Sequence, residues 1–281
     1  MRSPRRVTGI KHEVSAQQGD LIAFSIGNYA ALNGNLECID ALISQRKQMG
    51  RQRLAQPCFT DDGRQVFVKT TSIESYPSRL RISFGLKRRS GAYDWPLAEL
   101  RNNVRASEKT DMIPRLTGLG FARSKLGLVK EVFLTFENLT GYVNGLDWIN
   151  SRPEKIELFI RAGLDAIMKL NSQGIYHLDL WAGNIMFPNH SLEDAKVIDL
   201  ENCFIGSTAF HNETVGYQLA FFYQHSLENL ISENNYDEII KSYMHDRPEL
   251  QSKSGLEFYQ HFKQNGAGRK SRYLIPFRGR R

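Results

Sequence analysis

The fold is decided by residues 176–187, YHLDLWAGNIMF, together with residues 196–203, KVIDLENC. These segments set three polar residues, Asp179, Asn184 and Asp199, among apolar neighbours that a folded chain would bury. Burying a carboxylate is costly unless it is paired or coordinates a cation. Two carboxylates and an amide oxygen are ligands that suit a hard cation such as Mg²⁺.

The order of these residues matches the parts that phosphoryl transfer requires. A first Asp accepts the proton of the attacking hydroxyl, and an Asn and a second Asp bind the metal ions that bridge the nucleotide phosphates. HxDLxxxN followed by an apolar-apolar-Asp turn is a specific signal, because chance seldom supplies the whole ordered set. The structural alternative is that all three are turn and capping residues, a role that Asp and Asn favour.

These motifs resemble the protein-kinase-like superfamily, and within it the bacterial lipopolysaccharide kinase group of Kdo and inner-core heptose kinases. The catalytic loop of that group often reads HxDLxxxNIL, and its metal-binding Asp is followed by a hydrophobic and then a charged residue, as in VIDLENC. The resemblance covers roughly residues 46–205. It implies that Asp179 is the catalytic base and that Asn184 and Asp199 are Mg²⁺ ligands.

The resemblance also assigns residues to ATP. Lys69, in VFVK, corresponds to the lysine that holds the α- and β-phosphates, and Glu99 to the helix carboxylate that pairs with it. Glu137 and Leu139 fall where the kinase hinge offers backbone groups to adenine. The cofactors implied are therefore ATP and Mg²⁺.

The chain departs from typical protein kinases at several places. Leu178 replaces the arginine of HRD, so regulation through a phosphorylated activation loop is not expected. Asp199 is not followed by Phe-Gly, and before Lys69 only Gly50 stands near the first expected strands, with nothing like GxGxxG. Trp181 is bulky where family members often carry a smaller or polar residue, and contact with the acceptor is the one role we offer for it.

Local patterns predict the elements that would carry these residues. An Asp-Gly step between apolar runs predicts a hairpin, and an apolar face with 3.6-residue periodicity predicts a helix. The expected strands are 48–54, 57–60 and 65–69, with a turn at 61–63, and 127–136; the expected helices begin at Pro96 and after Pro153, the latter ending at Gly174, with further helices over 213–263.

We therefore predict an α+β, two-lobed protein-kinase-like fold with a small β-rich N-lobe and a mainly helical C-lobe. Residues 1–45 are expected to form an irregular N-terminal extension because they carry weak periodicity and several Gly and Asn. The N-lobe is expected at 46–140, the C-lobe at 141–265 and a basic tail at 266–281.

The charge is unevenly distributed. The formal net charge is +7, and residues 258–281 hold seven bases and no acid, so the body of the chain is neutral. Such a tail is either a solubilising end or an electrostatic tether for an anionic membrane, nucleic acid or acidic substrate. A basic stretch at 79–89 is either a solvated insertion or a site for the phosphate or carboxylate groups of an anionic glycolipid.

Composition restricts the remaining classes. With 41% hydrophobic and 24% charged residues over 281 positions, the chain is an ordinary globular one. Its three cysteines, Cys38, Cys58 and Cys203, form no CxxC pair, which argues against a disulfide framework or a zinc site. No apolar run approaches the roughly 20 residues of a membrane span. We expect a cytoplasmic protein, with peripheral contact to the inner membrane through the tail as an option.

The function predicted is transfer of the γ-phosphoryl group of ATP to a hydroxyl on a lipopolysaccharide core sugar or a related anionic glycolipid. Three alternatives stay open: a protein or small-molecule acceptor, a pseudokinase that serves as a scaffold, and a nucleic-acid-binding protein. The poor glycine loop favours the pseudokinase and the intact Asp and Asn set disfavours it. No nucleic-acid motif accompanies the basic tail, so no nucleic-acid partner is expected.

Overall fold

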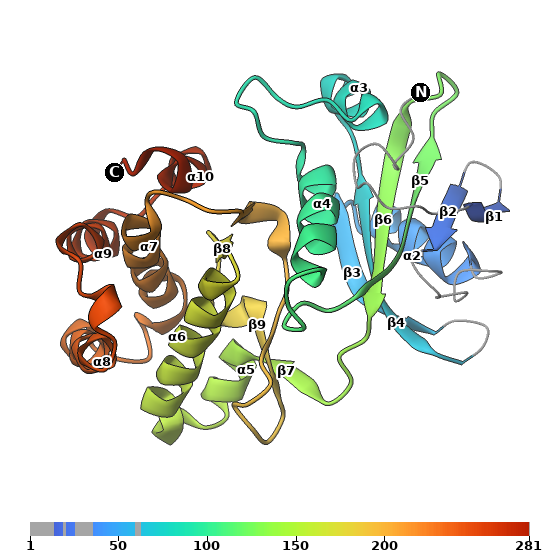
Figure 1. Ribbon diagram of the computed structural model, residues 1–281. Helices are drawn as coiled ribbons and strands as arrows, with labels where there is room; N and C mark the ends of the chain where they lie inside the picture. Colours follow the sequence, from blue (N-terminus) through green and yellow to red (C-terminus); the bar gives the residue numbers. More distant parts are fainter. Residues whose placement is uncertain (1–13, 19–20, 26–35, 60–62, 281) are drawn as a thin grey trace. The chain divides into compact units, whose positions relative to one another are not determined.

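The computed structural model describes residues 14–18, 21–25, 36–59 and 63–280, and the chain divides into two compact units. The first unit consists of Met1–Ser107 with Pro114–Thr140, and the second of Glu108–Ile113 with Gly141–Arg281 (Figure 1). Each unit combines helices with antiparallel strands, so the fold is mixed α/β. Within the described ranges, no helix has the length and apolar character that crossing a membrane needs.

The first unit is built on a six-stranded antiparallel sheet, whose strands lie in the order β1-β2-β5-β6-β4-β3. In that order the strands are Val14–Gln18, Leu21–Ser25, Leu116–Arg123, Val129–Glu137, Gln65–Ser72 and Arg53–Phe59. The predicted hairpin is present as the β3–β4 pair, which brings Phe59 opposite Gln65. Its expected turn at 61–63 lies mostly outside the described residues.

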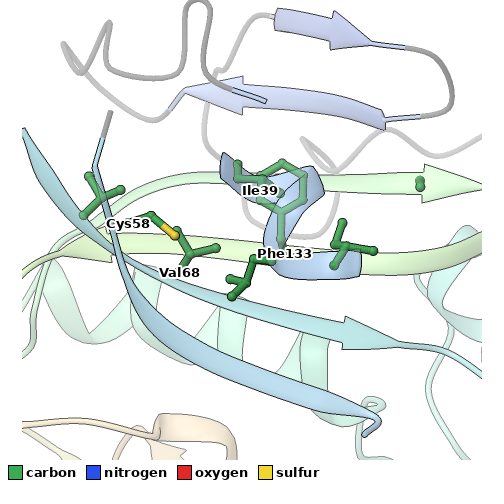
Figure 2. Close-up of a cluster of buried hydrophobic side chains, with 8 residues drawn as sticks. Ile39, Cys58, Val68 and Phe133 are labelled. Atoms are coloured by element: carbon green, nitrogen blue, oxygen red, sulfur yellow. The ribbon is translucent and has the colours of Figure 1, made fainter. Parts of the chain in front are cut away.

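Helix α2 (Leu36–Gln48) covers one face of this sheet. Alternate residues of a strand point to opposite faces, and Val66 and Val68 of β4 point to the face that α2 covers. Figure 2 shows the resulting core, which gathers Ile39, Leu42, Ile43, Cys58, Val66, Val68, Ala122 and Phe133. This packing fixes which face every other residue of β4 must occupy.

Helix α4 (Trp95–Ser107) packs on the opposite face. Its apolar residues Leu100 and Val104 join Leu134 and Phe136 of β6, with Phe67 of β4 packed against them. The prediction of a helix that begins near Pro96 is confirmed. The shorter helix α3 (Tyr76–Phe84) packs its Ile82 against Val129 and Val132 in a separate cluster.

The prediction that residues 1–45 are irregular is wrong for their described part, because that part forms β1, β2 and the first three turns of α2. The periodicity of α2 is hidden by Arg46: Ile39, Leu42 and Ile43 lead by helical steps to a charged residue that nevertheless has only 1% of its surface exposed. The strand expected at 48–54 therefore begins later, at Arg53, and the strands expected at 48–54 and 57–60 are one strand, β3.

The second unit is mainly helical. The predicted helix after Pro153 is confirmed as α6 (Ile156–Ser172), which buries one apolar face, and Gly174 follows it with φ 70°. The other helices are α5 (Gly145–Asn150), α7 (His211–Phe222) continued by a π-helical turn (Tyr223–Leu227), α8 (Glu233–His245), α9 (Lys253–Asn265) and α10 (Arg269–Arg278).

Short strands hold the loops that carry the predicted chemistry. β8 (Ile175–His177) pairs with β11 (Cys203–Ile205), and β9 (Ile185–Pro188) pairs with both β7 (Tyr142–Asn144) and β10 (Lys196–Val197). The segments between β8 and β9, and between β10 and β11, are therefore each held at both ends. These are the segments that contain Asp179, Asn184 and Asp199.

Within the basic tail expected at 266–281, residues Arg269–Arg278 form the packed helix α10 rather than a free end. Ile275 of α10 is fully buried, and Phe277 meets Phe204 of β11 edge to face, with ring centroids 4.9 Å apart. Thr208 donates a hydrogen bond to the carbonyl of Pro276. The sequence signal for this helix is weak because it buries only Ile275 and Pro276.

Candidate functional site

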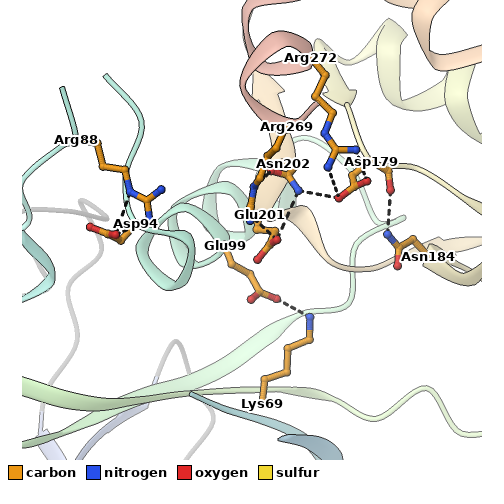
Figure 3. A network of polar contacts seen from close by, with 10 residues as sticks. All are labelled: Lys69, Arg88, Asp94, Glu99, Asp179, Asn184, Glu201, Asn202, Arg269 and Arg272. Atoms are coloured by element: carbon orange, nitrogen blue, oxygen red, sulfur yellow. Dashed lines mark hydrogen bonds and ion pairs between the residues drawn. The ribbon is translucent and has the colours of Figure 1, made fainter. Parts of the chain in front are cut away.

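Lys69 and Glu99 form an ion pair within the first unit. Val66 and Val68 face α2, so the intervening Phe67 and the next residue, Lys69, face α4. Lys69 Nζ lies 2.6 Å from Oε1 of Glu99, whose side chain is 4% exposed (Figure 3). The pair thus results from two facts. The register of β4 turns Lys69 toward α4, and Glu99 is next to Leu100, a residue that α4 buries against the sheet.

Glu137 and Leu139 lie at and just beyond the end of β6. The backbone N–H of Glu137 donates to the carbonyl of Arg115, and its carboxylate pairs with Arg115 Nε at 3.1 Å. Leu139 is half-buried in the segment that follows the strand. Asn138, between them, donates to Gln65 Oε1 and so ties this segment to β4.

The basic stretch at 79–89 is largely committed to contacts inside the first unit. Arg81 and Arg88 both pair with Asp94, which is 2% exposed, with N···O distances of 2.7 and 2.6 Å. Burial raises the pKa of Asp94, but the hydrogen bonds from the two guanidinium groups outweigh it and leave the pKa lowered. Arg79 donates to the carbonyl of Ile73. These arginines hold the segment before α4 in place, a structural role that neither sequence expectation named.

In the second unit, buried His177 braces the loop after β8. The N–H of Asp179 donates to His177 Nδ1 at 3.2 Å, so this nitrogen is unprotonated and the proton sits on Nε2, which lies 3.1 Å from the carbonyl of Ile198. Burial lowers the pKa of His177 and keeps the ring neutral. The ring therefore links the residue before Asp199 to the backbone of Asp179.

Asn184 is fixed with its amide nitrogen turned toward the same loop. It sits in a 3₁₀ turn (Ala182–Asn184), is 7% exposed, and donates from Nδ2 to the carbonyl of Asp179 at 3.0 Å. Because Nδ2 makes this bond, Oδ1 points away from the carbonyl and is the atom left for a cation. The N–H of Ile198 donates to the carbonyl of Asn184 and brings the second segment alongside.

Asp199 adopts a left-handed backbone conformation, with φ 67° and ψ 52°. Asp tolerates this region better than most residues other than Gly, but it is uncommon and marks a tightly constrained turn. The turn follows directly from β10 and enters a 3₁₀ helix (Leu200–Asn202). Asp199, Asn184 and Asp179 are thus brought onto adjoining segments, and their carboxylate and amide oxygens fit a hard cation.

The carboxylate of Asp179 also has partners that the sequence did not suggest. Arg272 of α10 donates from Nη1 to Oδ1 at 2.7 Å, and Asn202 donates from Nδ2 to Oδ2 at 2.7 Å (Figure 3). Arg269, one turn before Arg272, pairs with Glu201 at 2.7 Å and donates to Asn202 Oδ1. Asn202 stands three residues after Asp199 in the quoted motif, whereas Arg272 lies 93 residues from Asp179 and has no local signal.

The indole ring of Trp181 packs against Gly183. A Cβ added to Gly183 would come within 2.5 Å of the indole ring, so the ring needs a glycine beneath it. The backbone N–H of Ala182 donates to Ser226 Oγ, which anchors this part of the loop to the π-helical turn. This packing gives Trp181 a local structural role that the sequence did not indicate.

Comparisons with known proteins identify no family. No protein-family model matches the chain, and no curated protein sequence matches it. Among solved structures, WaaP in complex with acyl carrier protein is similar to it over 93% of this chain and 91% of that chain, with 17% sequence identity and a TM-score of 0.43. Function therefore has to follow from the chemistry of the residues described above.

Proposed function

We propose that this protein is a phosphotransferase that moves the γ-phosphoryl group of ATP, with Mg²⁺, to a hydroxyl group. The observation that carries the proposal is the hydrogen bond from Asn184 Nδ2 to the carbonyl of Asp179. It orients the amide oxygen as a cation ligand beside a half-buried carboxylate that is suited to accept a proton. Asp199 supplies the second ligand from the neighbouring segment.

The chain's own residues perform defined parts of this reaction. Asp179 accepts the proton of the attacking hydroxyl. The hydroxyl oxygen bonds to the γ-phosphorus while the bond between that phosphorus and the β–γ bridging oxygen breaks, which releases ADP. Asn184 and Asp199 would hold Mg²⁺, which would supply neutralisation of the charge on the phosphate oxygens. Lys69 binds the α- and β-phosphates and Glu99 fixes it, while backbone groups of Glu137 and Leu139 contact adenine, as the sequence resemblance implies.

For the acceptor we propose a core sugar of lipopolysaccharide, as the sequence resemblance to that kinase group implies. Fewer bases of residues 258–281 are available to attract an anionic glycolipid than the sequence suggests, because Lys263, Arg269 and Arg272 are all ion-paired. The exposed bases Lys270, Arg278 and Arg280 are the described residues of this segment that supply a peripheral membrane contact. A protein or small-molecule acceptor is the alternative within the same chemistry.

A pseudokinase is the second candidate function, and one observation favours it. A general base must be able to take up a proton, and the carboxylate of Asp179 is engaged by Arg272 and Asn202. An ionised carboxylate offers about four acceptor sites, however, and 25% of the side chain remains exposed. The contacts are therefore compatible with catalysis, and we retain the enzyme as the primary proposal.

Mg²⁺-dependent transfer of radioactive phosphate from ATP onto extracted lipopolysaccharide tests the proposal. Asp179→Ala and Asp199→Asn should each abolish transfer. Asp194→Asn is the matched control for the second change, because Asp194 has a similar left-handed backbone (φ 54°), is exposed and lies five residues earlier. ATP binding without transfer to the lipid would keep the kinase and discard this acceptor, whereas no ATP binding or turnover with any acceptor would leave the pseudokinase.

A further inference from the structure

The C-terminal helix α10 reaches the carboxylate of Asp179 through Arg272. Arg269 and Arg272 are one turn apart, so they share one face of the helix. Arg272 contacts Asp179 of the predicted site, and Arg269 contacts Asn202 in the turn that follows Asp199. Arg272 contacts Asp179 Oδ1 at 2.7 Å and Oδ2 at 3.5 Å, while Arg269 holds Asn202, the other partner of Asp179. The carboxylate of Asp179 thus accepts hydrogen bonds from Arg272 and Asn202, which belong to one connected network.

The position of Arg272 is determined by packing that a loose tail would not have. Its guanidinium lies over the ring of Phe221, 5.2 Å from the centroid, and its side chain is 14% exposed. Gly279 closes the helix with φ 53° at a point where an added Cβ would meet Phe210 Cδ1 at 2.3 Å. Phe277 packs on Phe204 of β11, the strand that follows Asn202. The helix and the 3₁₀ turn after Asp199 are therefore held to the same strand.

From this geometry we infer that Arg272 is a positioning residue for Asp179, an inference that rests on the proposed phosphotransferase function. A guanidinium holds a carboxylate in a fixed plane and can do so bidentately. Arg272 and Asn202 donate one hydrogen bond to Oδ1 and two to Oδ2, and so leave one of about four acceptor sites of the carboxylate, on Oδ1, to the substrate hydroxyl. The sequence segment that looks like a basic tail is thereby part of the active site, and truncation before residue 269 removes it.

The inference is tested by steady-state kinetics of Arg272→Ala, Arg272→Lys and the native chain, with extracted lipopolysaccharide and with water as acceptors. Loss of one charge-assisted hydrogen-bonded pair predicts a kcat lower by about 10- to 100-fold in Arg272→Ala, with the KM for ATP unchanged. Arg272→Lys should recover part of the loss. Guanidinium ion, at concentrations too low to unfold the protein, should restore kcat in Arg272→Ala because it can occupy the vacated place. Lys241→Ala, which removes an exposed base on α8 of the same unit, is the matched control.

The outcomes separate this inference from the proposed function. A native chain that turns over no ATP overturns both. A native chain that is active, with an equally active Arg272→Ala variant, overturns the inference alone. A higher kcat in Arg272→Ala overturns it as well, because α10 then covers the base instead of positioning it. A loss that neither lysine nor guanidinium relieves assigns Arg272 to the folding of the helix and again overturns it.

Discussion

Lys69 Nζ lies 2.6 Å from Glu99 Oε1 because Lys69 occupies the face of β4 on which α4 packs, and α4 carries Glu99. Lys69 stands opposite Leu134 in the β4–β6 pairing, and Leu134 joins a cluster with Leu100 and Val104 of α4, the helix that carries Glu99. Asn103, one turn further along α4, donates to the carbonyl of Glu99. The lysine is therefore held by a nearly fully buried carboxylate, while its own side chain stays 21% exposed and accessible to a phosphate.

Replacing Lys69 with Met should weaken binding of ATP by about 10- to 100-fold, because a charge-assisted hydrogen bond to phosphate is lost. Glu99→Gln should weaken it less, since the amide oxygen can still accept from Lys69 but no longer attracts its charge. The measurement is calorimetric titration with ATP and Mg²⁺. Lys125→Met, at an exposed turn of the same unit, is the control. Native affinity in Lys69→Met would contradict the assigned phosphate contact.

Arg46→Met should destabilise the first unit by about 3–5 kcal/mol, because it leaves a buried carboxylate with only the distant, exposed Lys47 at 3.9 Å as its ion-pair partner. Arg46 Nη2 lies 2.7 Å from Glu131 Oε2, and the two side chains are 1% and 7% exposed. The double variant Arg46→Met with Glu131→Leu should recover most of the loss, since neither charge remains buried. Urea unfolding measures both, with exposed Arg51→Met as the control. A double variant as unstable as the single one would contradict this account.

The same pair should make stability depend on pH in a definite direction. Burial raises the pKa of Glu131 above its ordinary 4.5 despite the attraction of Arg46. A raised pKa means that the folded state binds more protons than the unfolded state in the window just above 4.5, so this group favours folding less as pH rises through that window. The destabilisation in Arg46→Met should consequently be smaller at acidic pH than at pH 8, where Glu131 must stay charged.

Elements with strong local patterns could be predicted, and those that depend on distant partners could not. β4 and α6 alternate apolar residues with the period of a strand or a helix, so their bounds are close to the expected ones. The sequence did not predict α2 because one of its core positions is Arg46, whose burial depends on pairing with Glu131, 85 residues away. The sequence did not predict β5 because two glycines in so short a segment are typical of a loop.

The candidate site divides in the same way. Asp179, Asn184 and Asp199 stand within 21 residues of one another, and their order alone suggested a shared chemistry. The sequence also predicted that Lys69 would lie on a strand and Glu99 on a helix. Nothing near Asp179 in the sequence points to Arg272, since only the packing of α10 on β11 brings it there. A tail whose bases are not periodic gives no sign of which base is exposed and which is paired.

Cys58 should react with alkylating agents at a lower pH than an ordinary thiol. A hydrogen bond from the Cys38 side chain lowers the pKa of Cys58 to about 7, although burial acts in the opposite direction. Site-resolved mass spectrometry of iodoacetamide labelling over a pH series should give a midpoint near that value. Cys38→Ala removes the donor and should move the midpoint upward, whereas Cys38→Ser keeps a donor and should not. An unchanged midpoint in Cys38→Ala would assign the low pKa to another cause.

His177 should make the folded state less stable as pH falls below about 6.5. Burial lowers its pKa from 6.5, so in this window the unfolded chain binds a proton that the folded chain does not, and stability is lost with decreasing pH. His211, whose pKa burial also lowers, adds to the same slope. His177→Gln keeps a donor for Ile198 and an acceptor for Asp179 but cannot be protonated.

The free energy of unfolding of His177→Gln should therefore change less between pH 7 and pH 5 than that of the native chain, while the exposed-site control His190→Gln keeps the native slope. Urea titrations across this range provide the measurement. The variant should also retain ATP turnover at pH 7.5, because the ring acts through its two hydrogen bonds and not through a charge. A slope equal to that of the native chain would mean that His177 takes up a proton in the folded state as readily as in the unfolded state, and this would contradict a buried neutral ring that bridges Ile198 and Asp179.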